Sequence, residues 1–184
     1  MDHVVVLKYH RFLAKSVFSD HLLVRSSPQR KHFQHSAPSG QADMYKFLFI
    51  ANFDQRLRYA YYFDHVDKSK RAQLSTALVQ KCLSRTQTSC SFFEHEGFSI
   101  VYRKVGRLLF IIGTDGAENH LAVYEFVHAF VQVLDVYFAG VTEKHIITEF
   151  HKLHLVLQQM VCNGSVVETN VKNVLEPLRA FDSS

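Results

Sequence analysis

The stretch from 120 to 139 limits the folds open to this chain more than any other segment does. Its polar residues Glu125, His128, Gln132 and Asp135 recur at helical spacing, so they form one narrow stripe, and nearly every other position is apolar. A helix of this kind is buried on most of its circumference. We therefore expect it to lie between a sheet and a second layer made of another helix, another subunit, or both.

The segments before this helix are typical of a sheet with one inserted helix. Residues 45–52 and 57–63 predict a hairpin around a turn at 53–55, and an N-cap at Asp67 begins a helix over 68–85. Three short strands are expected next, and the third is apolar on both faces, which favours a central position in the sheet. These strands cover 91–94, 98–103 and 107–112, and the segments 113–116 and 114–119 read as turns.

Two more helices are expected after the long one. Apolar residues predict an amphipathic helix over 142–161 that ends at the run 162–164, and a final helix, capped by Thr169-Asn170, extends to about 180 with Pro177 bending or shortening it. The apolar face of the first of these helices consists of Ile146, Phe150, Leu153, Leu157 and Met160. The order predicts a mixed α/β protein of the α+β type, with five strands, one helix after the second strand, and three helices at the end.

A change of composition near residue 43 divides the chain into two parts. Residues 26–40 are rich in Ser, Pro and Gly, and Met44 then opens a dense apolar run. We expect 44–184 to be the folded domain. Residues 1–43 are expected to be a disordered extension, or the product of a start codon placed upstream of Met44; a transit peptide is the less favoured alternative.

The charge and cysteine content exclude several classes of protein. Residues 44–184 carry fifteen Lys and Arg against fourteen acids, without a basic stripe for nucleic acid. The odd set Cys82, Cys90 and Cys162 has no CxxC spacing, and no apolar run reaches the roughly 18 residues of a membrane span. The sequence therefore predicts a reduced cytosolic protein that does not bind nucleic acid.

Catalytic and cofactor motifs are not found. The chain lacks GxGxxG, GxxxxGK[ST], GxSxG and HExxH, and His151 and His154, with His145 nearby in sequence, do not supply the three or four ligands of a zinc site. We expect no enzyme activity, cofactor or metal. The enzyme alternative is a hydrolase that uses His128, or the pair His151 and His154.

Many segments of 44–184 resemble the small (sigma) subunits of clathrin adaptor complexes, in register and without a gap. The helix that reads FVQVLDVYF carries most of the specificity. The resemblance also rests on MYKF to Asn52, YFDHVD, KCLSR, CSFFE, VYR, ENHLA, EFVH and VVETN. The runs KCLSR, HVD and NGSVVETN are similar to the sigma subunit of adaptor complex 4.

The resemblance implies a longin-like fold, with a five-stranded antiparallel sheet sandwiched by helices. It also implies a non-catalytic subunit held by a large adaptin in a heterotetramer with a second large and a medium subunit. Such complexes are peripheral on trans-Golgi, endosomal or coated-vesicle membranes, where they bind cytosolic tails of membrane cargo. The alternatives are the sigma subunit of complex 3 or of another endosomal adaptor, and a stand-alone longin-type trafficking regulator.

The resemblance further implies a site for acidic dileucine signals. Arg58 corresponds to the arginine that meets the acidic residue, although its position alone is more typical of a solvated strand residue. The leucine pocket corresponds to Gly106, Leu108, Val131, Val141 and Ile146. Where many relatives read ELDLxFN, this chain reads EKHIITE, so Lys144 and His145 replace a Leu-Asp pair beside the expected pocket.

Overall fold

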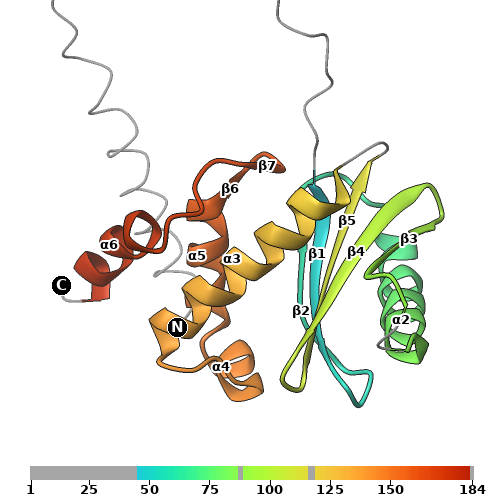
Figure 1. Cartoon of the computed structure of the whole chain (residues 1–184), viewed down its shortest axis with the longest axis horizontal. Coiled ribbons are helices and arrows are strands. Elements are labelled where there is room, and N and C mark those ends of the chain that lie inside the picture. The colour runs from blue at the N-terminus through green and yellow to red at the C-terminus, as the bar shows by residue number, and fades with distance from the viewer. Residues whose placement is uncertain (1–44, 87–88, 116–118, 183–184) are drawn as a thin grey trace, which may run out of the picture. The chain divides into compact units, whose positions relative to one another are not determined.

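The computed structural model describes residues 45–86, 89–115 and 119–182, and Figure 1 shows their arrangement. The expected extension and Met44 lie outside the described residues. The elements in chain order are β1 (Tyr45–Asn52), β2 (Leu57–Tyr62), α2 (Lys68–Ser84), β3 (Phe92–His95), β4 (Phe98–Val105), β5 (Leu108–Asp115), α3 (His120–Phe138), α4 (Glu143–Thr148), α5 (Phe150–Met160), β6 (Val161–Cys162), β7 (Ser165–Val166) and α6 (Val171–Asp182).

The strands β1 to β5 form one antiparallel sheet in the order β2-β1-β5-β4-β3. The predicted five-stranded antiparallel sheet is confirmed, and so is the central position of the third short strand, β5. The turn predicted at 113–116 is wrong for its first three residues, because β5 continues to Asp115. Gly113 pairs with Phe47 of β1, and a Cβ atom at Gly113 would overlap the Phe47 ring. Glycine is therefore required by packing here, not by a turn.

Helix α2 covers one face of the sheet (Figure 1). Its N-cap is Asp67, whose carboxylate accepts from the Ser69 N–H at 3.1 Å, as the sequence predicted. The predicted apolar set Leu74, Leu78 and Cys82 is buried against the sheet. This core also contains Phe47, Phe49, Ala51, Val79, Ile100, Tyr102, Leu109 and Ile111. Each of the larger side chains stabilises the fold by about 1.5–3 kcal/mol on burial.

Helices α3, α5 and α6 lie on the opposite face (Figure 1). The Phe130 ring of α3 meets Phe110 of β5 edge-on at 6.4 Å, α5 packs beside α3 and contacts β2 through His154 and Tyr59, and α6 packs against both helices. By length and composition α3 is apolar enough to cross a membrane, but seven of its apolar side chains are buried in the core, whereas Leu121 and Val136 are exposed. The second layer predicted for this helix is therefore supplied largely by the chain itself.

The helix predicted over 142–161 is wrong as a single element, because it divides at Glu149 into α4 and α5. The Glu149 backbone has φ −114° and ψ 30°; its N–H closes α4 on the His145 carbonyl, and its own carbonyl accepts the first hydrogen bond of α5. The change of direction buries Ile146 and Leu153 fully and leaves Phe150 52% exposed. A continuous helix would instead have placed all three on one face.

The C-terminal region contains a small hairpin that the sequence analysis missed. Strands β6 and β7 are joined by Asn163-Gly164, both with positive φ, which is a strong hairpin signal. Its Gly164 carbonyl accepts from the Tyr45 N–H at 2.8 Å, so the hairpin is tied to the sheet. Asn170 caps α6 as predicted, but the helix continues past Pro177 to Asp182 and is not shortened.

Candidate functional site

Arg58 lies on the edge strand β2, and a carboxylate from α4 holds its side chain. Its Nε donates to Oε1 of Glu143 at 2.7 Å, and the two side chains are 23% and 32% exposed. The same Oε1 accepts from Nδ2 of Asn52, the last residue of β1, at 2.9 Å. Arg58 is thus half-buried and paired with a carboxylate of the chain itself.

The side-chain amide of Asn52 holds the Glu143 carboxylate in place beside Arg58. Asn52 is 3% exposed, and its Oδ1 accepts from the Arg56 backbone N–H at 2.9 Å. Because Oδ1 is used in this way, Nδ2 must point toward the carboxylates of Glu143 and Asp54, the latter at 3.3 Å. Among the described residues, Glu143 is the hydrogen-bond partner of Arg58, and the bond uses the Nε of the guanidinium.

The five residues expected to line a leucine pocket come from three parts of the fold. Gly106 lies in the turn between β4 and β5 with φ +55°, and Leu108 begins β5 opposite Asn52. Val131 is on α3, and Ile146 is on α4, the helix that carries Glu143. Val141 joins these helices, and its N–H donates to Asp135 Oδ1 of α3 at 2.9 Å.

These residues differ in their access to solvent. Leu108 and Ile146 are 4% and 0% exposed, Val131 is 9% exposed, and Val141 is half-buried. Gly106 and Val141 are therefore accessible from solvent, whereas Ile146 is covered by other side chains.

His145 has a structural role in α4. Its ring stacks on Phe138 at 5.0 Å, and its Nδ1 accepts from the backbone N–H of Thr142, the N-cap, at 3.3 Å. A histidine thus replaces the carboxylate that usually completes a capping box. The neighbouring Lys144 is exposed and forms no ion pair with any described carboxylate.

The histidines of the enzyme alternative lie in different surroundings. His128 makes no hydrogen bond to any described residue, and His151 lies 3.7 Å from Glu149. His154 hydrogen-bonds with the Tyr59 hydroxyl at 3.1 Å and with Gln158 at 3.0 Å, which ties α5 to the sheet. Within the described ranges, no group of three His, Cys, Asp or Glu could hold a metal ion.

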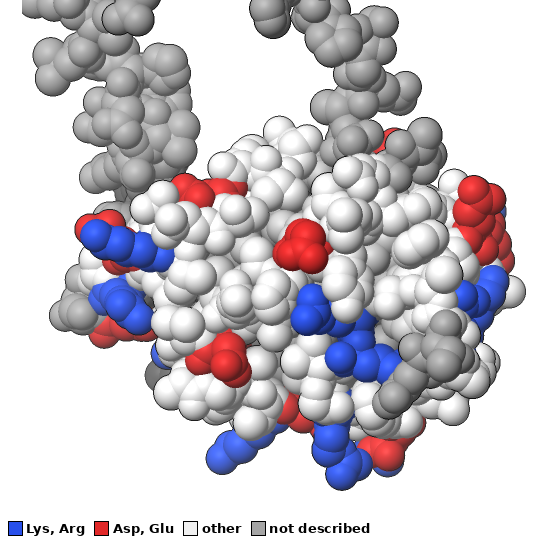
Figure 2. Space-filling view, in the orientation of Figure 1, with Lys and Arg blue, Asp and Glu red and all other residues white. Residues whose placement is uncertain are grey.

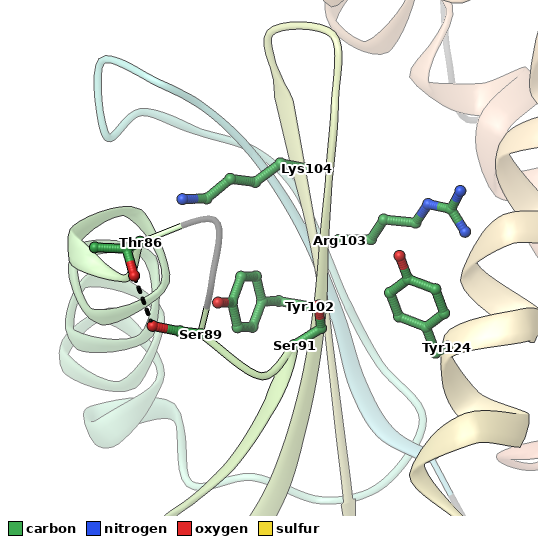
Figure 3. Close-up of a pocket in the computed structure, with 7 residues that line it drawn as sticks. All are labelled: Thr86, Ser89, Ser91, Tyr102, Arg103, Lys104 and Tyr124. Atoms are coloured by element: carbon green, nitrogen blue, oxygen red, sulfur yellow. Dashed lines mark hydrogen bonds between the residues drawn. The ribbon is translucent and has the colours of Figure 1, made fainter.

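A polar hollow of about 250 Å³ lies beside the end of β3 (Figure 3). Figure 3 shows that Lys104 and Tyr102 point toward α2, whereas Arg103 points to the other side of the sheet and stacks on Tyr124 of α3. Lys104 Nζ donates to the Arg85 carbonyl at 3.1 Å and so caps the end of α2. Because the two cations diverge, this hollow does not form an anion site.

An apolar hollow nearby is lined by the first turn of α3 and the start of β3. Phe92 and Leu121 border it and are 44% and 66% exposed, and the Phe92 ring stacks on His120 at 4.6 Å. Other exposed large apolar side chains are Phe53, Leu57, Val136, Ile147, Phe150, Val166 and Val167. On the face shown in Figure 2, charges of both signs are scattered and no cationic stripe is visible.

Glu143 and Asn52 are functional candidates that the sequence analysis did not identify. Glu143 was noted only as the first residue of a divergent segment, and Asn52 only as the end of a strand. Glu143 accepts hydrogen bonds from Arg58 and Asn52, which precede it by 85 and 91 residues. No local pattern in the sequence could have predicted it.

The chain is similar in sequence to known proteins. Residues 44–184 match the family described as clathrin adaptor complex small chain. The chain is 42% identical over 139 residues to the AP-4 complex subunit sigma-1 of Homo sapiens, covering 76% of this chain and 96% of that protein. It is 37% identical over 139 residues to the AP-4 complex subunit sigma of Arabidopsis thaliana, covering 76% and 97%.

A structural comparison matches the fold of one further chain. It is a chain in a homology model of the full-length AP-3 complex in a stretched open conformation, with a TM-score of 0.63 and 24% identity, covering 76% of this chain and 94% of that one. At this identity the likeness concerns the fold alone. The predicted longin-like sheet between helices is confirmed at that level.

Proposed function

The chain belongs to the family of clathrin adaptor complex small chains, and on that premise we propose that it is the sigma subunit of an AP-4 complex that sorts membrane cargo during vesicle transport. The observation that carries this proposal is the family match, which spans 44–184 and so includes every described residue. Identity of 42% and 37% to AP-4 sigma subunits of an animal and a plant favours complex 4 over complex 3. In this proposal the subunit supports the complex and contributes to recognition of cargo, and it does not catalyse a reaction.

The expected partner is a large adaptin, within a heterotetramer that also contains a second large and a medium subunit. The exposed apolar side chains support this, since Phe92 and Leu121 border one hollow and Val136 adds a third on the same helix as Leu121. Apolar groups at this exposure are commonly covered in an obligate complex. The assembled complex would act in the cytoplasm, peripheral on trans-Golgi, endosomal or coated-vesicle membranes.

We further assign recognition of acidic dileucine-type signals to the surface between β2, α3 and α4. Arg58 offers its terminal nitrogens to an upstream polar residue of the cargo, while Val131, Val141, Gly106, Leu108 and Ile146 receive the leucines. Each buried leucine contributes about 1.5–3 kcal/mol, and association itself costs several kcal/mol. A single signal should therefore bind weakly, and several complexes on one membrane would provide the avidity.

The partner proposal is tested by purifying the tagged chain from its source cells and identifying bound proteins by mass spectrometry. Stoichiometric recovery of two large chains and a medium chain of an AP-4 complex is expected. Recovery of AP-3 chains would reassign the complex. A small GTPase, or no stoichiometric partner, would favour a stand-alone longin-type regulator and refute the proposal.

The signal-binding proposal is tested with the reconstituted complex and a fluorescent dileucine peptide. Val131→Asp should abolish leucine-dependent binding, because it places a carboxylate against apolar side chains at a 9% exposed position. The matched control is Gln132→Asp on the same helix, where the side chain is exposed and binding should be retained. Unchanged peptide binding by a correctly assembled Val131→Asp complex would refute the pocket.

A further inference from the structure

The outer edge of β4 is only half covered by its neighbour β3. Strand β4 has eight residues and β3 has four, and their pairing begins at Phe92, which lies opposite Val101. One further backbone hydrogen bond extends the ladder, from the Tyr102 N–H to the Ser91 carbonyl at 2.8 Å. No described strand pairs with 103–105 on this side. The second half of β4 is therefore an open sheet edge.

The chain leaves this edge because the carbonyl of Cys90 is bonded elsewhere. It accepts from Arg85 Nη2 at 3.1 Å and from the Tyr102 hydroxyl at 3.5 Å, so it is directed toward α2 and not along the ladder. Figure 3 shows Ser89 beside α2 and Ser91 at the sheet, and both serines line the polar hollow of about 250 Å³. The open half of β4 therefore borders a space that could receive a segment of another protein.

Lys104 carries the open backbone groups of this edge. In an antiparallel strand, alternate residues direct their N–H and C=O groups to the same neighbouring strand. Tyr102 directs its N–H toward β3, so Lys104, two residues further on, directs its N–H and C=O to the same side. These two groups meet no described strand there. A segment that continued the position of β3 would pair with them, as in the recognition of peptides by strand addition.

The side chains along this edge are cationic on both faces of the sheet. Lys104 points toward α2, and Figure 3 shows that Arg103 points to the opposite side, toward α3. Near Lys104, the end groups of Lys81 and Arg85 lie over the Phe93 ring at 4.6 and 5.0 Å. None of these four cations forms an ion pair with a described carboxylate. The edge therefore has positive charge that the described residues leave uncompensated.

A strand, unlike a single anion, can reach both of the diverging cations. Consecutive residues of an extended segment point to opposite faces of a sheet, so one carboxylate would lie beside Lys104 and the next beside Arg103. Opposite charges at neighbouring cross-strand positions stabilise the pairing, and like charges destabilise it. Obligate interfaces are mainly apolar, whereas this edge is polar and charged, which is typical of a reversible partner.

We propose that residues 102–105 of β4 are a docking site for an extended acidic segment of a protein outside the adaptor complex. The segment adds to the sheet as a strand, and two consecutive acidic residues in it meet Lys104 and Arg103. This site goes beyond the proposed dileucine surface, because Arg58 lies on β2 at the other edge of the sheet. Its partner is recognised by main-chain pairing and charge and needs no leucines.

The test uses the full chain, purified from source cells with the subunits that remain bound to it. The probe is a short, threonine-rich fluorescein-labelled peptide with two consecutive glutamates at its centre and no leucine. We expect saturable binding below about 1 mM by fluorescence anisotropy. A peptide with both glutamates replaced by glutamine should bind at least about tenfold more weakly. A version with alternate backbone nitrogens methylated retains the charges and should not bind, because it lacks the N–H donors of a strand.

A pair of variants separates the edge from the general charge of the chain. Arg103→Gln should weaken binding by about threefold to tenfold, since it removes one charge and leaves the backbone edge intact. The matched control Arg107→Gln makes the same change at an exposed residue of the β4–β5 turn and should leave the affinity at its wild-type value. In amide hydrogen exchange, bound peptide should slow the Lys104 N–H and leave that of Arg103, which faces β5, unchanged.

Three results would overturn the proposal. They are the absence of saturable binding, equal binding of the methylated peptide, and a loss with Arg107→Gln as large as the loss with Arg103→Gln. A different role for cations on an open edge is to keep copies of a chain from pairing. If Lys104→Met makes the full chain self-associate while peptide binding keeps its wild-type value, that role replaces the proposal. Since the probe has no leucines, each of these results leaves the dileucine site standing.

Discussion

Replacing Gly113 by alanine should destabilise the domain, although alanine is ordinarily favoured over glycine in a strand. A Cβ atom at this position of β5 would overlap the ring of Phe47 on the neighbouring strand β1. The ring cannot withdraw easily, because Phe47 is fully buried, stacks on Phe49 at 4.6 Å, and meets Phe98 edge-on at 5.3 Å. The substitution must therefore shift a packed aromatic group or separate two central strands.

The magnitude follows from opposing effects. Overpacking of a core usually costs about 1–3 kcal/mol, and the loss of glycine entropy in the unfolded chain offsets about 0.4–1 kcal/mol. We expect a net loss of about 2 kcal/mol in the free energy of unfolding. For a domain of this size, that loss corresponds to a fall in Tm of about 4–8 °C.

A second substitution makes the reasoning specific to the Phe47 ring. Phe47→Leu alone should cost about 1–3 kcal/mol through a cavity, but it should relieve the overlap when combined with Gly113→Ala. The double variant should be at least about 1 kcal/mol more stable than the sum of the single effects predicts. Since the chain has eight tyrosines and no tryptophan, urea unfolding of the full chain can be followed by tyrosine fluorescence and far-UV circular dichroism. Additive effects, or a stabilising Gly113→Ala, would refute the proposed overlap.

Two further predictions concern titratable groups. Burial raises the pKa of the Cys82 thiol to about 12, so iodoacetamide at about pH 8 should label exposed Cys162 and spare Cys82 until the chain unfolds, as mass spectrometry can check. Equal labelling rates would mean that α2 does not cover the sheet as described. Lys46 donates to Asp115 at 2.9 Å and Asp64 at 2.8 Å, which raises the Lys46 pKa, and the same contact lowers that of Asp64. The pairing stabilises the fold above the unfolded-state pKa of Asp64 and below that of Lys46. Its contribution to stability disappears as pH falls through the folded-state pKa of Asp64. Because Lys46→Met removes the pairing, it should reduce the loss of stability between about pH 5 and pH 3. An unchanged acid transition would argue against it.

Local patterns in the sequence were sufficient for most of the fold. The spacing of Leu74, Leu78 and Cys82 predicted the buried face of α2, and the apolar character of 107–112 predicted a central strand. These features depend on periodicity within one element, which the sequence states directly. The thin polar stripe of α3 likewise predicted a layer on each side of that helix.

The errors occurred where tertiary packing decided between local alternatives. Residues 142–161 have a helical period throughout, but burying both Ile146 and Leu153 in a compact core requires the chain to turn at Glu149. Gly113 resembles a turn glycine in the sequence, and only the register of β1 against β5 reveals that it makes room for Phe47. The dipeptide Asn163-Gly164 is a local signal for a hairpin, but the sequence analysis interpreted it as the end of a helix.

The candidate site was likewise determined partly by the sequence and partly by the tertiary structure. The sequence by itself determined the family, through the register of many segments, and with it the positions of Arg58 and of the apolar residues expected around a peptide. Only the tertiary structure decided the electrostatic state of Arg58, because its partner Glu143 lies on another element, 85 residues away, and is itself held by Asn52 at the end of the adjacent strand. Side-chain type and spacing are local properties of a chain, whereas the charge that a ligand meets is the sum over groups that folding brings together.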